Sequence, residues 1–143
     1  MSTKIISFED LIIWQKAQDL AVKIYRLADA NKFICKDFSL KDQLKSAAIS
    51  DNIAEGFEYN NNPDFPRFLR IAKGSCGEIK NKILFVKRME YIDKITVENL
   101  VNEAKQLGKQ IGELIKKVKQ KIMLERKTRN SLLISHNYLT VTT

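Results

Sequence analysis

The residues with the clearest chemical pattern are lysines and arginines that repeat at helical spacing. Lys73, Lys80 and Lys87 are seven residues apart and therefore fall on one line of a helix. A second stripe repeats further along the chain, with Lys105 and Lys109 at its start. Cations arranged in this way bind nucleic-acid phosphates without reading the sequence. The predicted nucleic-acid-binding residues are Arg70, Lys73, Lys80, Lys87, Arg88, Lys105, Lys109, Lys116, Lys117 and Lys121.

Four polar residues form a second group, in segments that are otherwise apolar or small. Asn52 and Glu55 are three residues apart, so they are neighbours on one helix face. We expect them to meet Ser75 and Glu78 between two helices, in a structural polar network that fixes the register of packing. The enzymatic alternative assigns Glu55 and Glu78 as an acid/base pair, which requires a pocket around both carboxylates.

Other catalytic and metal-binding chemistry has few residues available. The chain has one histidine, His136, and two cysteines, Cys35 and Cys76, too few for a disulfide framework or the usual Cys/His zinc site. A di-iron centre needs Glu-x-x-His motifs, and neither Glu55 nor Glu78 begins one. We interpret Cys76 as a small core residue. We therefore expect no enzyme activity, no catalytic residue, no metal and no cofactor.

Four long helices are predicted to position these residues. Apolar side chains recur every three or four positions over residues 8–30, 39–57, 64–91 and 96–122. Only 5 Gly and 2 Pro occur in 143 residues, which argues against a β fold with many turns. We predict an all-α fold, an antiparallel up-down four-helix bundle over residues 1–124. Residues 125–143 are predicted to form a basic and polar C-terminal tail that frays.

Caps and glycines make these helix predictions more specific. Ser39 precedes an aspartate by three residues, the spacing of a capping box, and Thr96 is predicted to cap the last helix. Gly74 and Gly77 lie inside the third helix, where each glycine costs roughly 1 kcal/mol relative to alanine. We expect a close contact with the second helix, through Gly56, to offset that cost.

The positive charge is concentrated in the second half of the chain. Residues 80–143 contain 14 basic and 6 acidic side chains, and residues 1–79 contain 11 of each, so the whole net charge of +8 lies after residue 79. This asymmetry favours a polyanionic partner, and a solubilising surface is the alternative. No apolar run approaches the roughly 20 residues of a membrane span, and no secretory signal is visible. We expect a cytoplasmic location without membrane contact.

Several segments resemble one known family. The similarity spans about residues 5–120 and is carried by Phe8–Ala17, Leu40–Leu44, the Asn-Ile-Ala-Glu-Gly motif at Asn52–Gly56, Phe65–Ala72 and Lys73–Glu78. The chain resembles the four-helix-bundle proteins encoded in 23S rRNA intervening sequences. That family is similar in turn to the accessory protein of diversity-generating retroelements, a homopentameric barrel that works with a reverse transcriptase and RNA. The resemblance implies a small bundle that assembles into a ring.

Charge and resemblance together give one leading hypothesis. We expect a non-enzymatic nucleic-acid-binding protein, with RNA favoured over DNA, that acts as a homo-oligomer through basic surfaces on its third and fourth helices. By resemblance the oligomer is a pentamer. The alternative is a protein-interaction adaptor that docks a partner such as a reverse transcriptase through the same charges. Loss of binding on charge reversal favours the first hypothesis, and a pull-down that survives nuclease favours the second.

Overall fold

The described part of the chain is entirely helical in its regular structure. The computed structural model describes residues 4–45, 48–59 and 63–141, with side chains up to residue 135. No strand occurs among these residues, so the predicted all-α class is confirmed. The elements are the 3-10 helix η1 (Phe8–Asp10) and the α-helices α1 (Ile12–Ala30), α2 (Lys32–Lys36), α3 (Phe38–Lys45), α4 (Ile49–Glu58), α5 (Asp64–Arg88) and α6 (Lys94–Val141).

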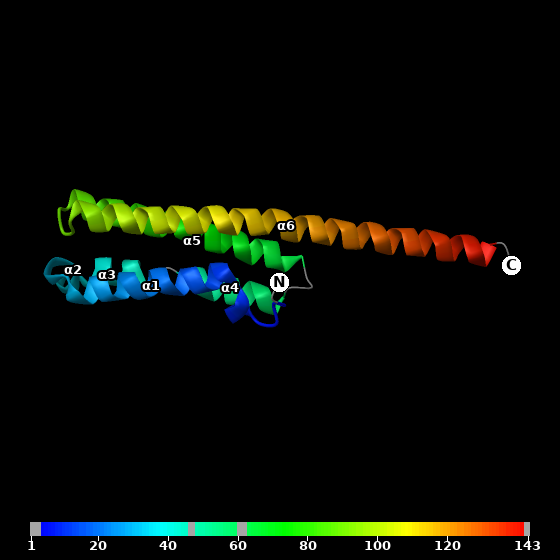
Figure 1. Ribbon diagram of the computed structural model, residues 1–143, viewed down its shortest axis with the longest axis horizontal. Helices are drawn as coiled ribbons and strands as arrows, with labels where there is room; N and C mark the ends of the chain where they lie inside the picture. Colours follow the sequence, from blue (N-terminus) through cyan, green and yellow to red (C-terminus); the bar gives the residue numbers. More distant parts are fainter. Residues whose placement is uncertain (1–3, 46–47, 60–62, 142–143) are drawn as a thin grey trace.

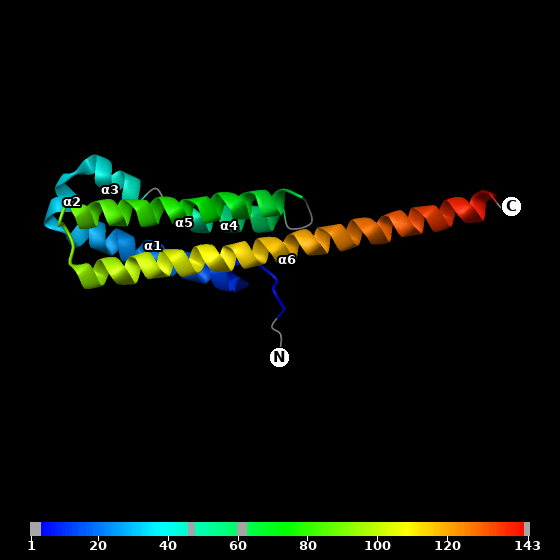
Figure 2. The same cartoon turned by 90° about the horizontal axis from the view of Figure 1, so that it is seen from above.

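The long helices pack side by side into what we call the helical body, the described residues between 8 and 118. Helix α5 contacts both α4 and α6, and α1 contacts the same two helices. The short helices α2 and α3 cover one end, against α1 (Figures 1 and 2). The predicted apolar stripes form the core. Side chains buried to 2 % exposure or less include Leu20, Ile34, Ile53, Leu69, Ile79, Ile83, Leu107 and Ile111.

The predicted second helix is interrupted. Its residues form α3 and α4, and the intervening residues 46 and 47 lie outside the described part. Helix α3 also begins before the predicted cap, because the Leu40 amide donates to Asp37 Oδ1 at 3.0 Å. The Ser39 hydroxyl instead accepts a 3.3 Å hydrogen bond from Gln43 within the helix. The carboxylate of Asp37 thus takes the capping role that the sequence pattern assigned to Ser39.

The start of α6 differs from its prediction in the same way. The helix begins at Lys94, and the Thr96 amide donates to Asp93 Oδ2 at 2.9 Å. The Thr96 hydroxyl donates to the other oxygen of this carboxylate at 2.6 Å, and these bonds lower the pKa of Asp93. Asp93 is therefore the cap, and Thr96 lies in the first turn.

The turn between α5 and α6 is hydrogen-bonded to the C-terminal end of α1. The Glu90 amide donates to Lys87 O and the Tyr91 amide to Val86 O, the two bonds of a Schellman motif. Glu90 holds the left-handed conformation of that motif, with φ of 59°. Asn31, which caps α2, donates through Nδ2 to Tyr91 O at 2.7 Å. One amide side chain therefore connects two chain reversals.

Only one of the three predicted close-contact glycines is required by packing. A Cβ on Gly56 would lie 2.7 Å from Phe68 Cβ and 3.1 Å from Phe65 Cδ2, so α4 and α5 meet there. The expectation for Gly74 and Gly77 is wrong, because a Cβ at either position would have nothing within 4 Å. Both glycines lie on the exposed side of α5. Their spacing in the sequence gives no information about which side of the helix faces a neighbour.

Helix α6 continues well beyond the helical body. It has 48 residues, or about 72 Å at 1.5 Å per residue. Ile115 is its last buried side chain, and every described side chain from residue 123 to 135 is exposed. Residues 125–141, predicted as a frayed tail, are helical. Figures 1 and 2 both show this end of α6 extending away from the other helices. We call residues 119–141 the projecting part of α6.

Candidate nucleic-acid interface

The ten predicted phosphate-binding residues are divided evenly between the two longest helices. Arg70, Lys73, Lys80, Lys87 and Arg88 lie on α5, and Lys105, Lys109, Lys116, Lys117 and Lys121 lie on α6. Nine of the side chains are exposed, and Lys80 is half-buried. Helical periodicity therefore predicted the solvent exposure of these residues correctly, because each lies off the apolar stripe of its helix.

The register of α5 against α6 brings most of these residues onto one face. The Nζ of Lys73 lies 3.1 Å from where a Cβ on Gly112 would be, so this side chain crosses α6 at that glycine. The helices are antiparallel, and seven residues forward on α5 correspond to seven residues back on α6. Lys80 is therefore level with Lys105. The resulting surface, which we call the basic face, comprises Arg70, Lys73, Lys80, Lys87, Arg88, Lys105, Lys109 and Lys116.

Two predicted residues lie away from the basic face. Lys117 follows Lys116 by one residue, which turns its side chain by about 100° around α6. It borders a groove with Asp10 and Ile12 from the N-terminal end of the body. Lys121 lies one turn further along the same side. The structure therefore groups eight of the ten residues and leaves these two on another flank of α6.

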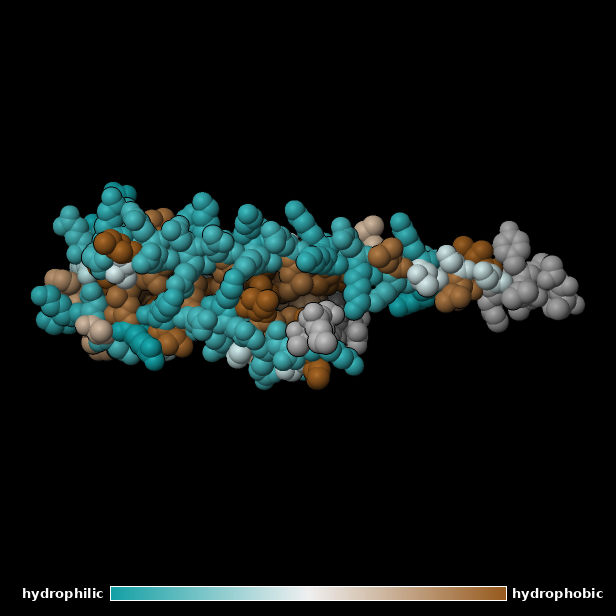
Figure 3. All heavy atoms as spheres, viewed as in Figure 1, coloured by the Kyte–Doolittle hydropathy of each residue, from teal (hydrophilic) through white to brown (hydrophobic). Residues whose placement is uncertain are grey.

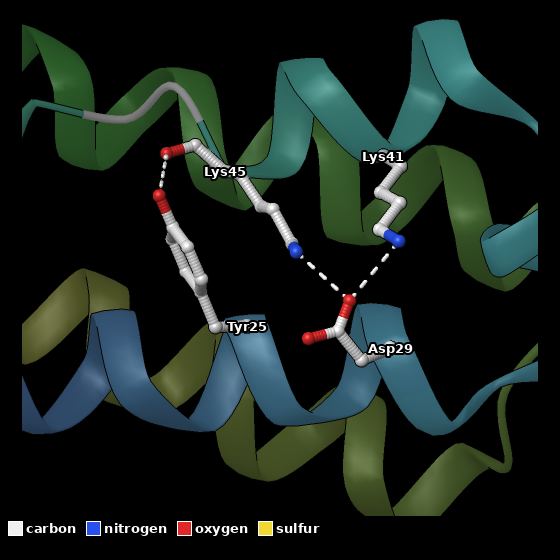
Figure 4. A network of polar contacts seen from close by, with 4 residues as sticks. All are labelled: Tyr25, Asp29, Lys41 and Lys45. Atoms are coloured by element: carbon white, nitrogen blue, oxygen red, sulfur yellow. Dashed lines mark hydrogen bonds and ion pairs between the residues drawn. The ribbon is translucent and has the colours of Figure 1, made fainter.

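Two lysines of the N-terminal half, Lys41 and Lys45, share one acidic neighbour. Figure 4 shows Lys41 and Lys45 of α3 reaching one carboxylate oxygen of Asp29 on α1, at 3.1 and 2.8 Å. Hydrogen bonds from Lys45 first, and then from Lys41, lower the pKa of Asp29. The Lys45 ammonium also lies 4.8 Å from the centre of the Tyr25 ring. The charge of these two lysines is used within the fold.

The basic face has no ion pair of this kind, although the exposed Glu113 lies between Lys109 and Lys116 on the same side of α6. The other ion pairs of the described residues join Lys23 to Glu103, Arg67 to Asp64 at 3.6 Å, and Lys94 to Glu98 at 3.9 Å. None of the ten predicted phosphate-binding residues takes part in an ion pair within the described chain. Their charge is therefore available to an external anion.

The predicted polar network does not assemble. Asn52 donates to Ala48 O at 2.7 Å and Ser75 donates to Ile71 O at 3.1 Å, so each bonds a carbonyl of its own chain segment four residues back. Glu55 and Glu78 are exposed. A different polar contact crosses between α1 and α4, where Gln18 Nε2 donates to Ser50 Oγ at 2.9 Å.

That contact was missed by the sequence reasoning, although its signal was available. Gln18 follows Ala17 on the apolar stripe of the first helix, and a polar residue at such a position needs a partner. Ser50 is 9 % exposed and supplies the acceptor. The sequence alone does not say which of several polar residues on the next helix would face Gln18.

Cys76 behaves as a core residue. Its side chain is 3 % exposed and packs toward Gly108, with its Cβ 3.5 Å from the position of a Cβ on that glycine. Burial raises the pKa of the thiol to about 12, which disfavours the reactive thiolate. Within the described residues, no three His, Cys, Asp or Glu side chains group as metal ligands would. No described helix combines the length and apolar composition needed to span a membrane.

Comparison with known proteins explains much of this architecture. The family model of the 23S rRNA-intervening sequence proteins matches residues 9–113. The chain belongs to this family. A crystal structure at 1.70 Å of a protein with unknown function, from the S23 ribosomal protein family of Bacteroides thetaiotaomicron, is similar with a TM-score of 0.65 and 25% identity. The match covers 73% of this chain and 99% of that chain. No curated protein sequence matches.

Proposed function

We propose that this 23S rRNA-intervening sequence protein is a non-enzymatic nucleic-acid-binding protein whose basic face contacts phosphates, with RNA as the preferred ligand. The observation that carries the proposal is the set of eight aligned cations on α5 and α6 with no ion pair in the described chain. A surface that only promotes solubility has both signs of charge interspersed. Isolated exposed cations such as Lys16 and Lys36 also have no ion pair in the described chain, so the clustering of these eight is what supports a ligand-binding role.

The aromatic residues favour contact with the backbone of the nucleic acid over contact with its bases. Tyr91, in the turn that follows α5, is half-buried and stacks on Phe33 with ring centres 5.1 Å apart. Its ring is therefore occupied within the protein. Phe85, 50% exposed in a groove with Lys87 and Arg88, is a single aromatic platform beside eight cations. Phosphate contacts therefore supply most of the affinity, and binding is sensitive to salt and tolerant of sequence.

The direct test is a charge reversal on the basic face. The variant changes Lys80, Lys87, Lys109 and Lys116 to Glu, and the matched control changes Lys4, Lys16, Arg26 and Lys36 to Glu. Both alter the net charge equally, and the control residues are exposed and outside the basic face. Fluorescence anisotropy with a labelled single-stranded RNA, over a range of salt concentrations, measures the affinity. We expect steep salt dependence in the wild type and loss of binding in the first variant alone.

Two outcomes contradict this proposal. Equal loss of affinity in the variant and the control shows that only net charge matters. Unchanged binding in the variant shows that the basic face is not used. If the chain instead captures a purified reverse transcriptase after nuclease treatment, the adaptor function replaces the nucleic-acid function.

We further propose that the chain forms a homo-oligomer of antiparallel four-helix bundles, a pentamer by family resemblance, with α3 and α4 together as the second helix. Two exposed apolar residues on α5 support self-association: Ile71 is 44% exposed and Phe85 is 50% exposed. They are fourteen residues apart and share one side of the helix, whereas Lys73 is about 200° around from Ile71. Lys87 and Arg88 border the same groove as Phe85, so association through this side leaves the other six residues of the basic face free. Native mass spectrometry of the wild type and of an Ile71→Ser, Phe85→Ser variant tests the assembly.

A further inference from the structure

The projecting part of α6 has no role in the architecture of the body. The family match ends at residue 113, before this segment begins. Its described side chains are exposed from residue 123 onward. In Figure 3 the projecting end shows mostly hydrophilic residues and a few hydrophobic ones next to the body, and a further hydrophobic group nearer the tip. The segment is an addition to the shared fold, and its composition indicates what it contacts.

The charge of the projecting part of α6 is almost entirely positive. Residues 119–129 contain five basic side chains and one acidic side chain, Glu125. Because the helix turns about 100° per residue, these cations point in many directions around it. Four of them were not among the ten predicted residues. They are Lys119, Arg126, Lys127 and Arg129, all exposed and without an ion pair in the described chain.

The same residues argue against pairing with a second copy of the helix. Inside the body, α6 carries an apolar residue at each first and fourth position of a heptad: Val97, Leu100, Ala104, Leu107, Ile111, Leu114 and Val118. The next three such positions are Lys121, Glu125 and Thr128. A coiled coil needs apolar side chains at these positions. The apolar seam is therefore interrupted where the helix leaves the body, whereas the positive charge continues.

We propose that the projecting part of α6 is a second phosphate-binding element, distinct from the basic face, and that it holds a nucleic-acid backbone along Lys119, Arg126, Lys127 and Arg129. The inference rests on the proposed function. A single helix with its side chains is about 10–12 Å wide and fits the major groove of B-DNA, which is about 12 Å wide. The major groove of A-form RNA is too narrow for it. A flexible single strand can also wrap the helix. Duplex DNA and single-stranded RNA are therefore the two arms of the test.

The experiment uses the full chain with four neutral replacements. One variant changes Lys119, Arg126, Lys127 and Arg129 to Gln, and the control changes Lys4, Lys16, Arg26 and Lys36 to Gln. Anisotropy titrations with labelled duplex DNA and labelled single-stranded RNA give the slope of log affinity against log salt. Each lost phosphate contact reduces the slope by about 0.9 for duplex DNA and about 0.7 for a single strand. We expect the first variant to lose about three units of slope on its preferred ligand, and the control to match the wild type.

The outcomes separate this inference from the proposed function. If the projecting variant binds like the control while the variant in Lys80, Lys87, Lys109 and Lys116 loses affinity, the inference fails and the proposed function stands. If the projecting variant loses affinity and the basic-face variant does not, the inference stands and the basic face is not the site. Absence of wild-type binding overturns both. A change in oligomeric mass with unchanged affinity also overturns the inference, since the segment then binds a second copy.

Discussion

The two parts of α6 show how one continuous helix can serve two purposes. Residues 94–118 bury an apolar stripe against α1 and α5, including Leu107 at 2 % exposure and Ile111 at 0 %. The projecting part carries leucines too, but Leu132 is 68% exposed and Leu133 is 56% exposed. Burial therefore stabilises the first part, whereas the second depends on helix propensity and on continuity with the first.

The difference shows that periodicity predicts packing better than it predicts helix length. An apolar stripe is required only where a helix packs, so its disappearance after Ile122 marks the edge of the body to within about one turn. It does not mark the end of the helix, which continues to Val141. Charge follows the same division, because acidic partners are found in the body and are nearly absent from residues 116–129.

The largest expected difference in stability comes from making the same Leu→Ala substitution in each part of α6. Leu107→Ala leaves a cavity in the core and costs about 2–5 kcal/mol of unfolding free energy. Leu132→Ala removes an exposed side chain from the same helix and changes stability by about 0.5 kcal/mol or less. Urea unfolding followed by circular dichroism measures both. Similar losses in the two variants would mean that the projecting part is packed against another molecule.

A pair of glycines gives the next largest effect. Gly56→Ala forces a Cβ against Phe68 and Phe65, and we expect a loss of about 1–3 kcal/mol from overpacking. Gly77→Ala adds a methyl group in open space and removes a poor helix former, so a gain of up to about 1 kcal/mol is expected. Thermal unfolding of both variants tests the prediction. Opposite signs confirm that only Gly56 is a contact glycine.

Replacing one asparagine in the body and one in the projecting part is expected to give a smaller difference in stability. Asn31→Ala removes the α2 cap and the bond to Tyr91 O, and we expect a loss of about 1–2 kcal/mol. Asn130→Ala lies in the exposed projecting part, where alanine is the better helix former, so stability is expected to be unchanged or slightly higher. Urea midpoints for both variants provide the measurement. A stable Asn31→Ala protein would contradict the proposed tie between the chain reversals.

The smallest effect is a pH dependence at the start of α6. Hydrogen bonds from Thr96 lower the pKa of Asp93 in the folded chain below its ordinary value of 3.8. The stabilisation is therefore complete above the unfolded pKa and is lost as the pH falls through the folded pKa. Asp93→Asn keeps a capping oxygen but cannot titrate there. Its urea midpoint is expected to fall less than that of the wild type between pH 6 and pH 2, and an identical decrease would contradict the assignment.

The sequence predicted the helical class and the main buried stripes because both follow from local periodicity. It did not predict α2, a five-residue helix that depends on the Asn31 cap and the burial of Ile34. Nor did it predict the interruption between α3 and α4, which short apolar patterns do not reveal. The predicted caps of α3 and α6 were wrong by two or three residues, because an aspartate caps each helix in place of the predicted Ser39 or Thr96.

For the candidate site, sequence spacing identified exposed cations but not their partners. Lys45 and Lys105 are both basic residues on helices, and only the tertiary fold shows that the former meets Asp29 while the latter has no ion pair in the described chain. The polar network failed for the same reason. Whether Asn52 bonds its own helix or a neighbouring one depends on distances that the order of residues does not contain.

The most direct test of the central claim is lysine footprinting of the wild-type chain with and without single-stranded RNA. Acetylation rates of individual lysines, read by mass spectrometry, report which ammonium groups the ligand covers. The account predicts strong protection of Lys80, Lys87, Lys109 and Lys116, and no protection of Lys16 on α1 or of Lys32 and Lys36 on α2, which are outside the basic face. Uniform protection across both sets, or protection of the second set alone, would contradict it.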